Sequence, residues 1–81
     1  MKYKVEFAPR AAKDLRALDK DIAGRIVSSI QSLESDLSGD IKSLKNFDYG
    51  YRLRVGDYRV LFDLERDLIT IRRVKHRREA Y

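Results

Sequence analysis

The chain has 81 residues, the length of one small domain, and we expect a single domain over residues 1–81. It has no cysteine, no signal-peptide pattern and no apolar run near the ~20 residues of a membrane span. These absences exclude disulfides and zinc–thiolate clusters and indicate a cytoplasmic protein without membrane contacts. The net charge of +5 lies entirely in residues 41–81, because residues 1–40 carry seven basic and seven acidic side chains. Polyanions are the usual partners of such a one-sided field.

The first half of the chain predicts a strand followed by two helices. Residues 2–7 alternate apolar and charged side chains, as a half-buried strand does. Pro9 suits the first turn of a helix that runs to about Leu18. Asp19 is the predicted N-cap of a second helix, and Gly39 fits the stop signal just past its end. An apolar stripe follows this second helix: Ile22, Ile26, Ile30, Leu33 and Leu37.

The second half predicts three antiparallel strands after an irregular segment. The irregular segment is residues 40–50, and the strands are residues 51–55, 58–64 and 68–75. Gly56-Asp57 is a two-residue connection that favours a type II′ hairpin turn. We therefore expect an α+β fold, with an N-terminal strand and a two-helix hairpin packed on one face of a mainly antiparallel sheet.

The two-residue loop determines which side chains of the hairpin face each other. With Gly56-Asp57 as the loop, Arg54 lies opposite Arg59, and successive side chains alternate between the two faces of the sheet. One face then holds apolar side chains that the helices can cover: Tyr51, Leu53, Val55, Tyr58, Val60 and Phe62. The other face holds guanidinium groups beside Leu61: Arg52, Arg54 and Arg59.

Like charges directly opposite each other destabilise a sheet by about 0.2–1 kcal/mol. Guanidinium suits planar, bidentate contact with phosphate, which would relieve this repulsion. Further cations flank the same face and are candidates for RNA binding: Lys42, Lys45 and Arg78. Because the arginines gather on one face, we favour a phosphate-binding surface over the alternative, a solvated basic face with Asp57 or Asp63 as counterions.

The C-terminal tail adds groups that could take part in chemistry: His76, Arg77, Glu79 and Tyr81. Metal-free RNA cleavage needs a base for the 2′-OH, an acid for the 5′-oxygen and cations around the phosphorus. From spacing alone, a solvated His76 and a Tyr81 that packs as a cap are the simpler interpretations. No group of His, Asp and Glu has metal-ligand spacing, so we expect no metal and no cofactor.

Several segments resemble the RelE/ParE superfamily of bacterial toxins, and its RelE branch in particular. They are FAPRAAKDLRAL near the start, IKSLK in the middle, YRLRVGDYRVLFD in the hairpin and VKHRREAY in the tail. The resemblance implies a microbial RNase-like fold over nearly the whole chain. It also implies a toxin that cleaves mRNA in the ribosomal A site without a metal, with the substrate's 2′-OH as nucleophile, and that a cognate antitoxin neutralises.

The resemblance also assigns roles. Arg59 in GDYRVLF matches the arginine that contacts the scissile phosphate, and Arg77 matches a second catalytic arginine that helps the leaving group. Tyr81 matches a tail tyrosine proposed as general base or base-stacking group. Lys45 stands where an arginine contacts RNA.

Arg52 and Arg54 depart from the family pattern, since the best-known members have two lysines there. Arginine stays protonated, so these two side chains can supply electrostatics but are poor acids or bases. His76 therefore becomes a stronger candidate for the general base, and the sequence does not decide between Tyr81 and His76.

The leading hypothesis is therefore the ribosome-dependent mRNA endonuclease of a type II toxin–antitoxin module. Three alternatives stay open: a ParE-like inhibitor of DNA gyrase, a non-catalytic RNA- or ribosome-binding module, and a degenerate toxin that only binds its antitoxin. The expected partners are an antitoxin protein, mRNA and the ribosome.

Overall fold

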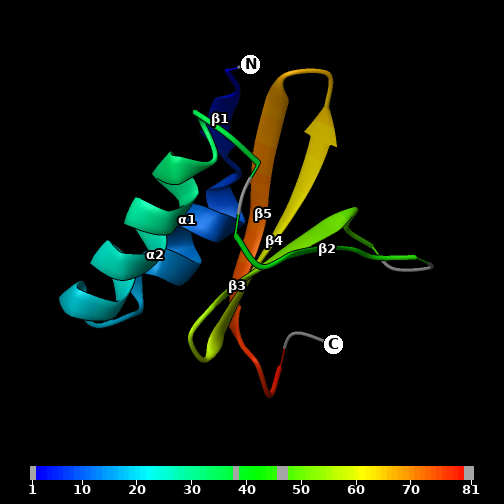
Figure 1. Ribbon diagram of the computed structural model, residues 1–81. Helices are drawn as coiled ribbons and strands as arrows, with labels where there is room; N and C mark the ends of the chain where they lie inside the picture. Colours follow the sequence, from blue (N-terminus) through cyan, green and yellow to red (C-terminus); the bar gives the residue numbers. More distant parts are fainter. Residues whose placement is uncertain (1, 38, 46–47, 80–81) are drawn as a thin grey trace.

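A computed structural model describes residues 2–37, 39–45 and 48–79, which form two helices and a five-stranded sheet (Figure 1). In chain order the elements are β1 (Lys4–Phe7), α1 (Pro9–Arg16), α2 (Lys20–Ser32), β2 (Ile41–Ser43), β3 (Tyr51–Val55), β4 (Tyr58–Glu65) and β5 (Leu68–His76). The strand order is β1-β5-β4-β3-β2. β1 runs parallel to β5 and the other neighbours are antiparallel, so the predicted α+β fold is confirmed.

One face of the sheet is covered by both helices, which lie on the same side in Figure 1. Alternation along the hairpin sends Leu53, Val60 and Phe62 into this layer, and all three are buried. The helices and β5 complete the core with Ala11, Ile26, Ile30, Leu33, Ile69, Ile71 and Val74. Since the core occupies this face, the opposite face of the sheet is left for polar side chains.

The predicted register of the β3–β4 hairpin is confirmed at every position. Val55 pairs with Tyr58 next to the turn, and Tyr51 pairs with Phe62 at the far end. Gly56 has φ of 57°, in the left-handed region that glycine adopts without steric cost and that the first residue of a type II′ turn requires.

The second helix ends earlier than predicted. α2 stops at Ser32, and Gly39, with φ of 106°, belongs to the connection before β2 instead of capping the helix. From Leu33 to Ser35 the backbone N–H groups bond to the carbonyl three residues earlier, as in a 3₁₀ turn. The N–H of Tyr3 donates to the carbonyl of Glu34 at 2.8 Å. That bond ties the end of the helix to the strand β1. Leu33 and Leu37 still pack on the core, so the apolar stripe extends beyond the helix.

Two features of the sheet were not predicted. The segment taken as irregular contains β2, which pairs with β3 so that Lys42 lies opposite Arg52. A bulge interrupts β4–β5 pairing, because Leu61 pairs with Arg73 whereas Phe62 pairs with Ile71. The extra residue in β5 is therefore Arg72.

Asp14 ties α1 to β5 where no strand covers the edge of the sheet. β1 pairs with β5 only as far as Ile71. Beyond that point the Asp14 carboxylate accepts the backbone N–H of Val74 at 3.0 Å and the Nε–H of Arg73 at 2.7 Å. Burial tends to raise the pKa of Asp14, but these hydrogen bonds and the nearby positive charges outweigh it and lower that pKa.

We predict that Asp14→Asn lowers the free energy of unfolding by about 1–3 kcal/mol near neutral pH, because it removes charge-assisted hydrogen bonds. A lowered folded-state pKa contributes stability above the unfolded pKa, and that contribution is lost as the pH falls through the folded pKa. The gap between wild type and variant should therefore close in acid. Urea denaturation at about pH 7 and about pH 2 measures it. A gap that is absent at neutral pH, or unchanged in acid, would contradict this role.

Candidate nucleic-acid interface

The sheet face that the helices leave uncovered is lined by cations in two cross-strand rows. The pairing registers define one row as Lys42, Arg52, Leu61 and Arg73, and the other as Arg54, Arg59 and Lys75. We call these seven side chains the basic face. Directly paired residues on neighbouring strands are close enough to interact, so the six cations form one continuous positive surface.

In the first row, two charged side chains cover an apolar one. Leu61 is fully buried although it lies on the basic face. It pairs with Arg52 on one side and Arg73 on the other, whose side chains are only 12% and 20% exposed. Long arginine stems thus cover Leu61. Arg52 is less open than the sequence suggested, and its Nε is buried without a hydrogen-bond partner among the described residues.

Asp40 is the counterion of two arginines. Its carboxylate lies 3.4 Å from Nη1 of Arg52 and 3.6 Å from Nη1 of Arg54. The backbone N–H of Arg54 donates to the Asp40 carbonyl at 2.9 Å, which holds Asp40 beside both arginines. The alternative counterions considered from the sequence, Asp57 and Asp63, instead pair with Arg77 and Arg72.

Two further arginines meet at the β3–β4 turn. Nη1 of Arg59 donates to the carbonyls of Gly56 at 3.0 Å and Tyr58 at 2.9 Å, which fixes this guanidinium over the turn. The backbone N–H of Arg77 donates to the carbonyl of Asp57 at 2.7 Å. The end of β5 is thereby held beside the hairpin. Arg59 of β4 and Arg77, which directly follows β5, therefore lie near the same turn.

The remaining candidates are more dispersed. His76 pairs with Tyr58 on the helix-covered face, with the two rings edge to face at 5.4 Å, and its Nδ1 accepts the N–H of Arg78 at 3.2 Å. Its imidazole therefore lies on the opposite side of the sheet from Arg59, although His76 lines one pocket with Arg73 and Lys75. Lys45 is exposed after β2 and Arg78 is exposed in the tail. Tyr81 lies outside the described residues.

Arg73 and Lys75 belong to the basic face but were not singled out from the sequence. Extending the hairpin register into the third strand would have suggested them, since they alternate with Val74 of the core. The hydrogen bond to Asp14 raises the pKa of Arg73, which stays charged. Asp40 was also missed, because its role depends on the unpredicted pairing of β2 with β3.

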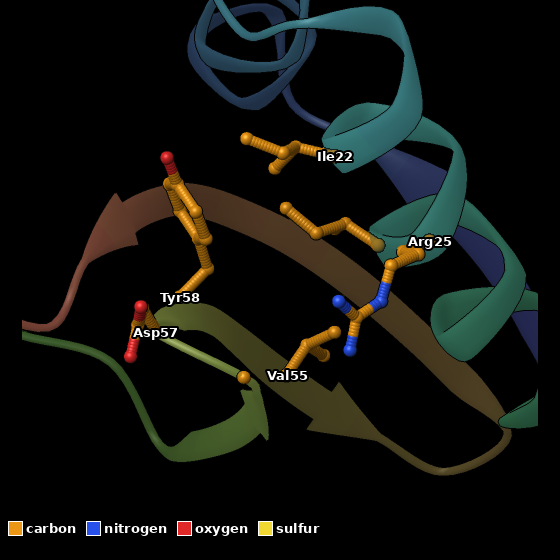
Figure 2. Close-up of a pocket in the computed structure, with 7 residues that line it drawn as sticks. Ile22, Arg25, Val55, Asp57 and Tyr58 are labelled. Carbon is orange, nitrogen blue, oxygen red and sulfur yellow. The ribbon is translucent and has the colours of Figure 1, made fainter.

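A groove of about 230 Å³ lies beside the β3–β4 turn, on the face of the sheet that the helices cover (Figure 2). Ile22 and Arg25 of α2 line it together with Val55, Asp57 and Tyr58 of the hairpin. It is partly apolar with a cation at its rim. In residues 2–37, 39–45 and 48–79, no cluster of His, Asp and Glu could hold a metal ion, and neither helix is long and apolar enough to span a membrane.

Known proteins match this chain over nearly its full length. The family profile described as "ParE toxin of type II toxin-antitoxin system, parDE" matches residues 5–81. Toxin RelE3 of Methanocaldococcus jannaschii is 39% identical over 83 residues, which cover 96% of this chain and 94% of that protein.

Solved structures agree with the sequence matches. A chain in a RelB–RelE antitoxin–toxin complex from Methanococcus jannaschii is 35% identical, with a TM-score of 0.76 and 93% of each chain covered. An archaeal RelE–RelB complex from Pyrococcus horikoshii contains a chain 28% identical, with a TM-score of 0.79 and coverage of 99% of this chain and 100% of that one.

We predict that Asp40→Asn strengthens binding of a short 2′-O-methyl RNA by up to about fivefold, because an exposed ion pair contributes about 0–1 kcal/mol. It should also steepen the salt dependence, since two released guanidiniums can then displace counterions from phosphate. Fluorescence anisotropy at several salt concentrations measures both effects. Asp21→Asn, on the exposed surface of α2, makes the same change in net charge and should have little effect. Equal effects of the two variants would show that net charge alone matters.

Proposed function

This chain belongs to the RelE/ParE superfamily of type II toxin–antitoxin toxins, and on that basis we propose that it is an endoribonuclease that cleaves mRNA in the ribosomal A site. The observation that carries the proposal is the approach of Arg54, Arg59 and Arg77 to one hairpin turn, at the edge of a continuous basic face. Guanidinium groups in such an arrangement suit a phosphodiester, which presents several oxygens in different directions.

The reaction assigned to this face is attack of the substrate's own 2′-OH on the adjacent phosphorus, without a metal. The bond from phosphorus to the 5′-oxygen breaks, leaving a 2′,3′-cyclic phosphate and a 5′-OH end. Negative charge grows on the phosphoryl oxygens in the transition state, where fixed cations stabilise it most effectively. Arg59 contacts the scissile phosphate, Arg52 and Arg54 neutralise its charge, and Arg77 stabilises the leaving group.

The general base is the least defined of these roles. His76 lies on the helix-covered face, and its Nδ1 is engaged by the N–H of Arg78. This placement favours Tyr81 as the group that takes the proton from the 2′-OH. Arg77 precedes Tyr81 by four positions in the sequence.

The ribosome and an antitoxin are the partners that this function implies, and both place the protein in the cytoplasm. The relatives from Methanococcus jannaschii and Pyrococcus horikoshii were solved as complexes of RelE with RelB. A net charge of +5 suits an acidic partner. The groove beside Arg25 offers such a partner apolar contact next to a cation (Figure 2).

Inhibition of DNA gyrase is the second candidate function, because the matching family profile is described as a ParE toxin. The two activities are separable in cells. An mRNA endonuclease arrests translation and creates new mRNA 5′ ends, whereas a gyrase inhibitor induces the DNA-damage response and leaves mRNA intact. A non-catalytic ribosome binder would do neither, but would bind ribosomes with a steep salt dependence.

We predict that induced expression of the chain produces new mRNA 5′ ends within ribosome-bound codons. Arg59→Ala should reduce this cleavage by about 10²–10³-fold, since it removes a donor to the transition state. Sequencing of mRNA 5′ ends after induction measures the effect. Arg16→Ala, on the exposed surface of α1, is the matched control and should cleave like wild type. Growth arrest by wild type with unchanged mRNA would reject the proposal.

Arg59 also bonds to the turn, so the fold of the variant needs its own measurement. Thermal unfolding by circular dichroism serves this purpose. A folded Arg59→Ala protein that cleaves at the wild-type rate would reject the role of Arg59.

We predict that Tyr81→Phe lowers the rate of single-turnover cleavage by about 10²-fold or more if Tyr81 is the base, because the ring remains but the phenolic proton carrier is lost. If Tyr81 only stacks on a base, Phe should preserve activity and Tyr81→Ala should lose it. His76→Gln is the companion variant, and it should retain cleavage. A large loss in His76→Gln with none in Tyr81→Phe would reverse the assignment.

A further inference from the structure

Lys75 lies beside Arg59, at the β5 end of the row that Arg54, Arg59 and Lys75 form. It pairs directly with Arg59 across β4–β5, and Arg59 pairs in turn with Arg54. Its neighbours at alternate positions along the chain are Arg73 and Arg77. Lys75 is half-buried, and no ion pair within 4.0 Å joins its ammonium to a described residue.

Lys75 differs from its neighbours in chemistry. Guanidinium groups remain protonated in proteins, so Arg54, Arg59 and Arg77 can stabilise charge but are poor proton donors in a reaction. An ammonium carries a similar charge and can also give up a proton to a strongly basic oxygen. The other lysine of the basic face, Lys42, lies three strands away at the far end of the other row. Among the described residues of the basic face, Lys75 is therefore the cation paired with Arg59 that can act as an acid.

We propose that Lys75 is a catalytic residue that protonates the leaving 5′-oxygen, an inference that rests on the endoribonuclease function proposed above. As the 2′-oxygen bonds to phosphorus, its proton passes to the general base. The bond from phosphorus to the 5′-oxygen breaks with its electron pair on that oxygen, and the Lys75 ammonium supplies the proton. The products are a 2′,3′-cyclic phosphate, a 5′-OH and a neutral amine, which regains a proton from water.

The charged and titratable groups around Lys75 come from several elements. They are Arg54 of β3, Asp57 of the turn, Arg59 of β4, Arg73, His76 and Arg77 of β5 and its end, Asp14 of α1 and Glu79 of the tail. Two of the carboxylates are already paired, Asp14 with Arg73 and Asp57 with Arg77. Positive charge thus predominates around the ammonium, as a growing alkoxide requires.

The test compares Lys75→Arg with Lys75→Met in single-turnover cleavage of ribosome-bound mRNA. Arginine keeps the positive charge but not the ability to donate a proton, so both variants should lose about 10²-fold or more in rate. Lys20→Met, on the exposed start of α2, is the control and should behave like wild type.

A synthetic mRNA with a sulfur in place of the scissile 5′-oxygen gives the sharper result. A thiolate leaves without a proton, so Lys75→Arg should cleave this substrate within a few-fold of the wild-type rate. A Lys75→Arg protein that cleaves ordinary mRNA as fast as wild type, or that stays equally impaired on the thio substrate, would overturn the assignment. Absence of cleavage by wild type would reject the endoribonuclease function itself, and the role of Lys75 with it. Circular dichroism and ribosome binding of each variant separate these outcomes from misfolding or lost affinity.

Discussion

The register of the β3–β4 hairpin is the constraint on which the rest of the structure depends. Because Gly56-Asp57 is a two-residue turn, Leu53 and Val60 meet on one face and Arg54 and Arg59 meet on the other. A shift of one residue would send the arginines into the core and the apolar side chains into solvent. One short turn thus creates both the surface that the helices cover and the surface that carries the charge.

The pairing of cations across strands lowers the stability of the sheet but creates the surface that the proposed function needs. Cations paired across strands repel one another, and the protein offsets the repulsion only in part. Asp40 neutralises Arg52 and Arg54 at an exposed position, whereas Asp14 holds Arg73 in a more buried one. The remaining positive charge, around Arg59 and Lys75, has no carboxylate in its own row. The basic face is therefore a surface that a phosphodiester can stabilise, and the antitoxin of such a module would benefit from the same field.

The sequence predicted those parts of the fold that short-range rules determine. Alternation, Pro9 and the Gly56-Asp57 turn gave the strands, the first helix and the hairpin register. The errors lie where long-range contacts decide. The early end of α2 depends on a bond between Tyr3 and Glu34, and β2 is too short to be recognised without its partner. For the same reason Asp40 and Lys75 were not singled out, and the side of the sheet on which His76 lies was not foreseen.

The most direct test of the central claim is an NMR titration of the arginine side chains with an RNA dinucleotide that lacks the attacking 2′-OH. Binding at the basic face should shift the Nε–H resonances of Arg52, Arg54, Arg59 and Arg77 together, with one affinity. The arginines on α1, Arg10 and Arg16, should stay unchanged. Shifts confined to the α1 arginines, or shifts spread evenly over both groups, would contradict the account.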